Sequence, residues 1–284
     1  MIICHLCNYE GEKKFRQYKE MIIYKCPECN MCFQDPGKAP GFTGPSVENI
    51  NNRYYSLVEP HINLDKKRLQ RVKVLLSKPL LDLSVLEIGS GIGTLGFQFL
   101  SEGASYVGFE PSNSLFNISM DKFPGLKKNI FNMAYDEGII RGRRFDLIIM
   151  IDTFEHIPYP VNFLRGLHSV LKDGGLIYIE VPNESVLAGK AVLRNLFGLY
   201  DGYPTNPGHV NLFTPPTLKK AIELAGYNNA GIYQVSVLGD RDRLRIIFNK
   251  NKLPLWVEGA RLFFRLTRID ILLQQGNLFL LAQK

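Results

Sequence analysis

One stretch of the 284-residue chain decides its fold: Val85-Leu86-Glu87-Ile88-Gly89-Ser90-Gly91-Ile92-Gly93. Its first half is an apolar run typical of a buried strand, and its second half is a glycine loop. Glycine suits such a loop because the backbone must turn sharply and let a ligand approach without a Cβ atom in the way. We expect a helix over Thr94–Leu100, directly after the loop. This order predicts the start of a βαβ unit.

A second apolar run, Tyr106–Pro111, ends in Glu110 and a proline. In a βαβ unit the second strand lies beside the first, so a carboxylate at its C-terminal end can accept both hydroxyls of a ribose. Together the two segments predict a site for an adenosine-containing cofactor. Gly91, Gly93 and Gly96 also fit the dinucleotide pattern G-x-G-x-x-G, which is a weak signal taken alone.

Glu87 discriminates between the cofactors that this loop can bind. A carboxylate inside an apolar strand is costly unless it has a partner. Beside a pyrophosphate the carboxylate would be repelled by a like charge, whereas beside a cationic amino-acid group it would be attracted. The loop matches acid-x-G-x-G-x-G at Glu87, Gly89, Gly91 and Gly93. Here the chain resembles the class I S-adenosylmethionine-dependent methyltransferases, which implies that the loop holds the methionine part and Glu110 the ribose. The alternative is a structural glycine turn in another α/β protein.

Length and composition fit one large α/β domain with a small appendage. Hydrophobic residues make up 45% of the chain and charged residues 21%, as in ordinary globular proteins. No segment reaches the ~18 to 20 apolar residues that span a bilayer, and no signal peptide is visible. We therefore expect a cytoplasmic protein. The net charge of +7 suits an acidic partner, whether nucleic acid, anionic lipid or a phosphorylated substrate.

Four of the five cysteines form two C-x2-C pairs separated by 18 residues: Cys4 with Cys7, and Cys26 with Cys29. This is the spacing of a four-cysteine zinc site. Asparagine, which tolerates a left-handed backbone, follows each pair. Lys14–Tyr18 and Met21–Lys25 are expected to form a hairpin that brings the pairs together. We predict a zinc ribbon over residues 1–35.

Other interpretations of the cysteines stay open. Two chance pairs of reduced, buried cysteines are the alternative, because nothing indicates an extracellular, disulfide-bonded chain. Cys32 forms a further C-x2-C with Cys29, so it is an alternative ligand. His5 is another, although we expect its side chain to be exposed.

Residues 36–80 are predicted to be a linker followed by N-terminal cap helices. Glycine and proline are frequent over residues 34–50, and Val47–Lys78 looks helical with an interruption near Pro60. The basic run Lys66-Lys67-Arg68 is interpreted as a solvated helix face. In the resembled family such helices cover the cofactor, which makes Tyr54 or Tyr55 a candidate contact; our choice is Tyr55.

The methyltransferase domain is predicted over residues 81–284, with a Rossmann-like, seven-stranded, mostly parallel sheet covered on both faces. Leu171–Gly175 is expected to end a helix. Family members carry an acid near the end of the third strand, where this chain has Asn132. The remaining strands are predicted at Asn129–Met133, Phe145–Ile151, Leu176–Val181, Tyr233–Leu238 and Leu278–Ala282.

The loop after the fourth strand, Asp152–Pro158, is expected to face the reacting methyl group, because ligands bind beyond the carboxyl ends of the strands. A sulfonium methyl is already electrophilic, so the enzyme must align the acceptor and remove a hydroxyl proton. His156 has the pKa of a general base, with Glu155 beside it; a purely structural role for both is the alternative. Asp152 is also a candidate cofactor contact.

Asp152-x-x-Glu155-His156 resembles an arrangement that binds a divalent ion in the O-methyltransferases of quinone biosynthesis. The resemblance implies a Mg²⁺ that holds a diol or catechol-like acceptor and lowers its pKa.

Two further segments extend the domain. Residues 186–214 are a lid candidate because they are long and rich in glycine and proline. Within them His209-x3-Phe-Thr looks like a pattern of glycan and small-molecule methyltransferases, making His209 a second base candidate or an anchor of the lid. Residues 249–275 are predicted to be a helical insertion with Arg261, Arg265 and Arg268 in one stripe. Such a helix suits a peripheral membrane contact, a dimer interface, or a helix pair buried on the domain.

The sequence thus predicts methyl transfer from S-adenosylmethionine to a small-molecule or glycan acceptor, most often at oxygen, as in polysaccharide biosynthesis on lipid-linked sugars. The zinc ribbon would be structural or would cover the substrate. One alternative is an rRNA or tRNA methyltransferase, although no dense basic run interleaved with aromatics is present. The other is a non-catalytic protein that binds S-adenosylmethionine.

Overall fold

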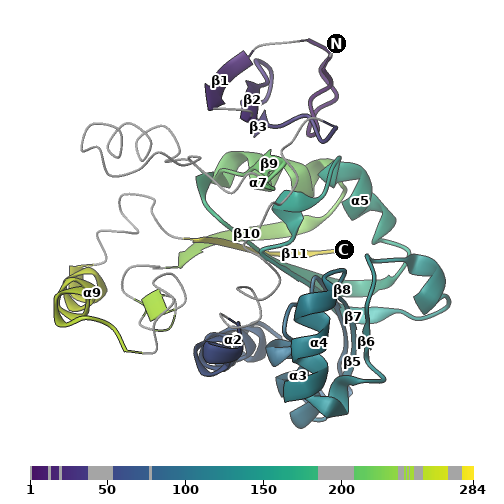
Figure 1. Ribbon diagram of the computed structural model, residues 1–284. Coiled ribbons are helices and arrows are strands. Elements are labelled where there is room, and N and C mark those ends of the chain that lie inside the picture. Colours follow the sequence, from purple (N-terminus) through teal and green to yellow (C-terminus); the bar gives the residue numbers. More distant parts are fainter. Residues whose placement is uncertain are drawn as a thin grey trace.

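The computed structural model describes residues 2–11, 14–18, 21–37, 54–76, 79–184, 208–235, 240, 242, 244–245, 252–267 and 277–284. These residues form a large α/β body and a small β-rich module at the N-terminus (Figure 1). Most of the expected linker, lid residues 186–207, and residues 249–251 and 268–275 of the helical insertion lie outside the described residues.

The body is built on a seven-stranded sheet in the order β10-β11-β8-β7-β4-β5-β6. The five strands from β8 to β6 pair in parallel, whereas β11 pairs antiparallel with β8 and β10. The prediction of a seven-stranded, mostly parallel sheet is therefore confirmed. The strands are β4 (Ser84–Ile88), β5 (Ser105–Phe109), β6 (Ile130–Phe131), β7 (Phe145–Ile151), β8 (Leu171–Val181), β10 (Asn228–Val235) and β11 (Asn277–Gln283).

Two strand boundaries differ from those expected. The predicted helix end at Leu171–Gly175 is wrong, because these residues begin β8 with an irregularity in its pairing to β7. Gly174 has φ +74°, a left-handed backbone that glycine adopts easily, and it lies where the strand is distorted. β10 begins at Asn228, five residues before the predicted start, because pairing with β11 extends it through a segment of low strand propensity.

Helices cover both faces of the sheet, and those over Val58–Leu75, Thr94–Ser101 and Leu255–Thr267 lie in segments where the sequence predicts helix. The helical segment is interrupted close to the expected place: a turn at Leu57 separates helical residues 54–56 from α2, and Pro60 lies in the first turn of α2, where a missing N–H costs nothing. The helices are α2 (Val58–Leu75), α3 (Thr94–Ser101), α4 (Asn113–Lys122), α5 (Pro160–Gly166), α7 (Pro215–Leu224) and α9 (Leu255–Thr267), with 3-10 turns η1 (Leu80–Asp82), η2 (Pro124–Leu126), η3 (Glu137–Ile140) and η4 (Phe154–His156).

Side chains that alternate along each strand build one core on each face of the sheet. Leu86 and Ile148 belong to the core that includes Leu218 of α7. Their neighbours Val85 and Leu147 belong to the opposite core, with Leu69 of α2 and Phe99 of α3. Burial on both faces leaves the carboxyl ends of the parallel strands as the open edge.

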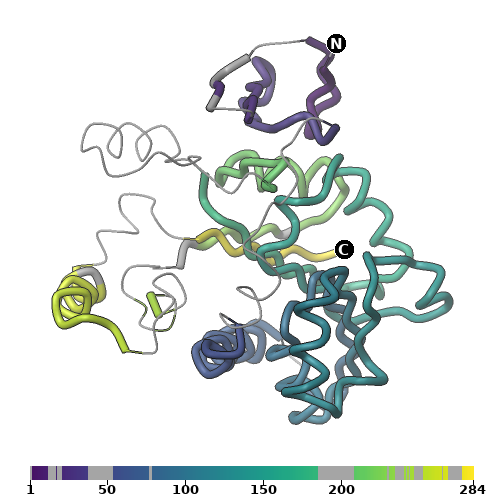
Figure 2. The backbone as a smooth tube through the Cα atoms, in the orientation of Figure 1, coloured from purple at the N-terminus to yellow at the C-terminus, as the bar shows by residue number. Residues whose placement is uncertain are grey.

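The N-terminal module is joined to the body through a strand. Its hairpin, β1 (Lys14–Tyr18) and β2 (Met21–Lys25), is confirmed and continues into β3 (Cys32–Phe33). β3 pairs antiparallel with β9 (Asn211–Leu212), which comes from the far end of the lid region. In Figure 2 the purple N-terminal tube accordingly lies next to the green segment that follows the lid.

Helix α9 lies to one side of the sheet (Figure 1). Among the described residues, no helix is long and apolar enough to cross a membrane.

Candidate active site

A cavity of about 750 Å³ opens where β4, β5 and β7 end. The loop after β4 lines it, together with residues that follow the other two strands and with residues of α2 and the turn before it. This is the edge at which ligands bind in open α/β sheets. The lining includes Glu87, Gly89, Gly91, Glu110 and Asp152, all predicted cofactor contacts.

The three glycines of the loop all have left-handed backbones, with φ of +80° at Gly89, +56° at Gly91 and +77° at Gly93. A Cβ atom at Gly89 would lie 2.1 Å from Oγ1 of Thr153, and one at Gly93 would lie 2.3 Å from Oγ of Ser119. A Cβ at Gly91 would meet nothing within 4 Å. The first and third glycines therefore let the loop pack, and the second lies where a ligand can approach the backbone.

Glu110 connects the end of β5 back to the glycine loop. Its carboxylate accepts hydrogen bonds from the backbone N–H of Gly91 at 2.7 Å and of Ser112 at 2.8 Å. Burial raises the pKa of Glu110, and these two hydrogen bonds oppose the shift. The carboxylate is fixed against the cavity in the position expected for a ribose-binding acid.

Glu87 is 3% exposed and accepts a hydrogen bond from the hydroxyl of Tyr106 at 2.5 Å. Burial raises the pKa of Glu87 to about 8, although the Tyr106 hydrogen bond opposes that shift. An acid with this pKa keeps its proton at neutral pH unless a cation lies beside it. The position therefore favours a ligand with a positively charged amino-acid group.

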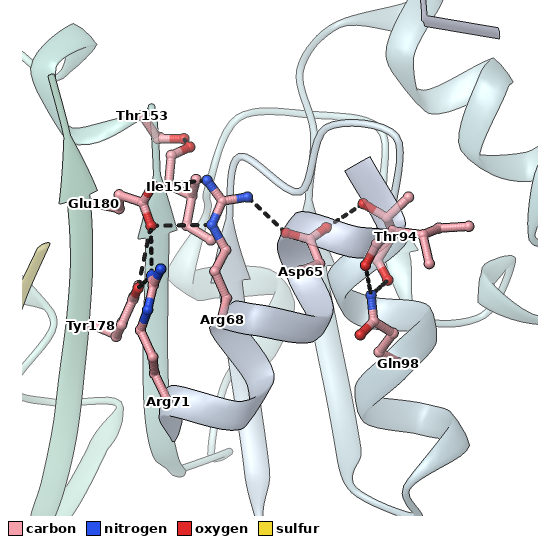
Figure 3. A network of polar contacts seen from close by, with 10 residues as sticks. Asp65, Arg68, Arg71, Thr94, Gln98, Ile151, Thr153, Tyr178 and Glu180 are labelled. Carbon is pink, nitrogen blue, oxygen red and sulfur yellow. Dashed lines mark hydrogen bonds and ion pairs between the residues drawn. The ribbon is translucent and has the colours of Figure 1, made fainter. Parts of the chain in front are cut away.

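Arg68 belongs to a buried ion-pair network beside the cavity (Figure 3). Its guanidinium donates to Glu180 at 2.9 and 3.1 Å and to Asp65 at 2.7 Å, and Asp65 also accepts a hydrogen bond from the Thr94 hydroxyl. Burial lowers the pKa of Arg68, but the charges of Glu180 and Asp65 overcome this effect and raise it. Asp65, Arg68 and Thr94 line the cavity.

The interpretation of Lys66-Lys67-Arg68 as a solvated face is wrong for Arg68, although both lysines are exposed. Arg68 lies four residues after Leu64 and four before Val72, both of them buried. Residues at this spacing share a helix face, which was the signal that could have identified it.

Beside the cavity, η4 meets the segment before β9. A carboxylate oxygen of Glu155 and one imidazole nitrogen each of His156 and His209 lie within 4.8 Å of one another. Nδ1 of His156 lies 2.8 Å from the carbonyl of Gly208, so Nδ1 carries the proton and Nε2 keeps its lone pair. His156 is exposed toward the cavity, but desolvation by the surrounding protein, followed by the neighbouring His209, lowers its pKa. A neutral imidazole with a fixed tautomer therefore lines the cavity.

His209 and Glu155 lie behind His156. His209 is 8% exposed, with Nδ1 3.3 Å from Glu184 and Nε2 3.7 Å from Glu155. Neither Glu155 oxygen accepts a hydrogen bond from the described residues. Burial, followed by the charge of Asp152, raises the pKa of Glu155 well above its ordinary value. The cavity lining includes His156 but not His209 or Glu155.

The donor set here does not fit the Mg²⁺ site implied by Asp152-x-x-Glu155-His156. Asp152 is not part of the cluster, and His209 takes its place. Two imidazoles and one carboxylate differ from the oxygen ligands that Mg²⁺ prefers. Asp152 instead lines the cavity, with a left-handed φ of 47°.

Two expected cofactor contacts lie elsewhere. Tyr54, not Tyr55, lines the cavity, while the ring of Tyr55 packs under Nζ of Lys122 at 4.5 Å. The side chain of Asn132 donates to the backbone carbonyl of Glu110 at 2.9 Å and does not reach the cavity, which Ala134 and Tyr135 line instead.

The cysteines converge as the spacing predicts. Sγ atoms of Cys4, Cys7, Cys26 and Cys29 lie within 4.8 Å of one another, with Cys4–Cys29 and Cys7–Cys26 each 3.5 Å apart. Four thiolates about 2.3 Å from one zinc ion lie about 3.8 Å apart in a tetrahedron, so the cluster fits zinc. Asn8 and Asn30 have φ of 59° and 60°, which confirms the expected left-handed turns.

The structure corrects the expectation for His5 and distinguishes Cys32 from the cluster. Cys32 lies in β3, outside the group of four. His5 is 3% exposed rather than exposed, and its Nδ1 lies 2.9 Å from the side-chain oxygen of Asn211. It is buried because β9 covers this side of the ribbon.

The fold and cavity are those of a class I methyltransferase, and comparison with known proteins gives the family. A family model described as a methyltransferase domain matches residues 61–231, so the chain belongs to this family. The structure is similar to a SAM-dependent methyltransferase from Archaeoglobus fulgidus, with 21% identity, a TM-score of 0.51, and coverage of 81% of this chain and 100% of that one. Magnesium protoporphyrin IX methyltransferase from Synechocystis PCC 6803 with bound SAH has 14% identity, a TM-score of 0.50, and coverage of 86% and 95%.

Curated relatives include ubiquinone biosynthesis O-methyltransferases. The protein from Coxiella burnetii is 28% identical over 116 residues, which are 40% of this chain and 48% of that protein. The one from Rhizobium etli is 26% identical over 153 residues, 53% of this chain and 62% of that protein. The chain matches about half the length of these relatives.

Proposed function

We propose that the protein transfers the methyl group of S-adenosylmethionine to an oxygen of a small-molecule or glycan acceptor, such as a lipid-linked sugar. One observation carries the proposal: the cavity has acids fixed for the donor at the ends of β4 and β5, and a neutral imidazole at the end of β7. The O-methyltransferases among the curated relatives support oxygen as the acceptor atom.

The donor half of the site consists of Glu87, Glu110 and the glycine loop. Glu110 would accept hydrogen bonds from the ribose hydroxyls, and the open space over Gly91 would admit the methionine part of the cofactor. Glu87 would ionise when the ammonium group lies near it, since a neighbouring cation favours the charged carboxylate. S-adenosylmethionine supplies an electrophilic methyl group, and these side chains bind and orient it.

The acceptor half centres on His156. An acceptor oxygen attacks the methyl carbon, the sulfur–carbon bond breaks, and the hydroxyl proton passes to Nε2 of His156. Nδ1 of His156 is held by the Gly208 carbonyl, so the accepting nitrogen faces away from that bond. His209 and Glu155 pack behind the base and position it rather than contact the acceptor.

Methyl transfer to defined pools tests the proposal. Zinc-loaded protein and methyl-labelled S-adenosylmethionine are incubated together with one acceptor pool at a time: oligosaccharides, catechols or RNA. We expect label in one of the first two pools, and a loss of about 100-fold or more in kcat for His156→Gln. His168→Gln is the matched control, since His168 contacts Ala225 and Tyr227 away from the cavity. Transfer to RNA alone would refute the acceptor class, and binding without transfer would favour a non-catalytic protein.

Helix α9 favours a peripheral membrane contact as a second role. Leu255, Leu262 and Leu266 recur at helical spacing and are 91%, 49% and 75% exposed, and Trp256 is 70% exposed. Arg265, also exposed, borders this apolar face. We expect the protein to sediment with anionic vesicles and Leu262→Glu to remain in solution. Concentration-dependent dimerisation without vesicle binding would instead assign the face to a second copy.

A further inference from the structure

The zinc ribbon is tied directly to the segment that carries His209. β3 pairs with β9, and the backbone N–H of Gln34 donates to the carbonyl of Val210 at 2.9 Å. The side-chain nitrogen of Gln34 donates to the carbonyl of His209 itself at 2.7 Å, and Gln34 is 1% exposed. The backbone of His209 is therefore held by the ribbon.

A second connection leads from the ribbon to the loop that carries His156. His5, which follows the zinc-ligand candidate Cys4, contacts the side-chain oxygen of Asn211 at 2.9 Å. The side-chain nitrogen of Asn211 donates to the carbonyl of Ile157 at 2.7 Å. His5 and Asn211 are 3% and 0% exposed, so water does not replace these bonds readily. Ile157 directly follows His156.

The loop held in this way has an unfavourable backbone. It begins with Asp152 at φ 47° and ends with Tyr159 at φ 52°, both non-glycine residues in the left-handed region. Such conformations persist only where the surrounding structure determines them. The ring of His5 lies 5.2 Å from that of Tyr159, so the ribbon contacts the strained end of the loop as well as its middle.

We propose that the ribbon is a positioning element for methyl transfer: His5 and Gln34, acting through Asn211 and the β3–β9 pair, hold His156 against the acceptor and His209 behind it. Zinc, by folding the ribbon, then sets the acceptor side of the site. The donor side is tied to the ribbon less directly, because Glu87 and Glu110 make their hydrogen bonds within the body and the glycine loop meets the ribbon-held loop only where Gly89 packs against Thr153. The catalytic meaning of this coupling rests on the proposed function, but the coupling itself does not.

Hydrogen–deuterium exchange on the whole chain tests the coupling. We compare His5→Leu and Gln34→Met, which remove the polar contacts, with Glu28→Gln on the exposed surface of the ribbon. We expect exchange over residues 153–159 and 208–213 to rise about tenfold in the first two variants, as for loss of one buried hydrogen bond. Residues 89–93 and the affinity for S-adenosylmethionine should change less than about twofold.

Zinc removal by a chelator is the second measurement, and it does not depend on either variant folding. Exchange should rise in the same two segments and not in the glycine loop. Unchanged exchange at 153–159 and 208–213 after zinc removal would overturn the inference, as would an equal rise at 89–93. If the coupling holds but no acceptor pool is methylated, the proposed function fails and the ribbon still positions this loop.

Discussion

Replacing Arg68 by methionine tests whether its buried ion pairs stabilise the floor of the cavity. The side chains of Arg68, Asp65 and Glu180 are 8%, 6% and 0% exposed. Methionine fills similar volume but leaves Asp65 without the cation of Arg68, and leaves Glu180 with only the more distant Arg71, 3.7 Å away. Removing one partner of a buried pair costs about 3–5 kcal/mol, because the remaining charge is uncompensated. We therefore expect a loss of about this size in the free energy of unfolding.

Lys67→Met is the matched control, one residue earlier on the same helix. Nζ of Lys67 pairs with Asp240 and Asp242, but the lysine side chain is 44% exposed. Exposed pairs contribute about 1 kcal/mol at most. Urea unfolding followed by circular dichroism should separate the two variants, and the midpoint of thermal unfolding of Arg68→Met should fall on the order of 10 °C. Equal losses for both variants would refute the reasoning.

The other predictions concern the donor loop and the zinc site. Burial raises the pKa of Glu87 from 4.5 to about 8, so its contribution to stability is present below pH 4.5 and is lost as pH rises through 8. A cationic ligand favours the ionised carboxylate instead, so the affinity for S-adenosylmethionine measured by calorimetry should rise from pH 6.5 to 8.5. Glu87→Gln should show no such rise. Gly93→Ala should lower the thermal midpoint strongly, because its Cβ would meet Ser119 and its backbone is left-handed. Gly91→Ala adds the strain of a left-handed backbone but meets no atom, so it should lower the midpoint less and mainly weaken cofactor binding. Thermal unfolding and titration check this order, and the opposite order would contradict it. The protein should contain one zinc per chain by mass spectrometry, lost in Cys4→Ser and retained in Cys32→Ser; equal loss in both would point to an exchanged ligand.

Local patterns predicted much of the fold and the donor site. The glycine loop, Glu87 and Glu110 lie within one βαβ unit, so their spacing along the chain fixes their spacing in space. The cysteine pairs are similar, because each knuckle is a short turn completed by a left-handed asparagine. Both features depend on residues that are neighbours in sequence.

Contacts between distant segments were not visible in the sequence. Arg68 and Glu180 are 112 residues apart, and the hydrophobic spacing around Arg68 does not name its partner. His5 and Asn211 are 206 residues apart, and the two-residue strand β9 is too short to show a periodic pattern. The cluster beside the cavity contains His209 where the sequence had suggested Asp152, and this difference has the same cause. It depends on how the segment before β9 returns to η4.

Calorimetric titration with S-adenosylmethionine tests the donor site most directly. The zinc-loaded chain should bind one equivalent, and Glu110→Ala should weaken binding by about tenfold or more, through loss of the ribose contact and of the Gly91 hydrogen bond. NAD should produce no comparable heat, because its pyrophosphate brings no cationic group to the buried carboxyl of Glu87. Binding of NAD in preference to S-adenosylmethionine, or equal affinity of Glu110→Ala and the unaltered protein, would contradict the assignment of this cavity to the methyl donor.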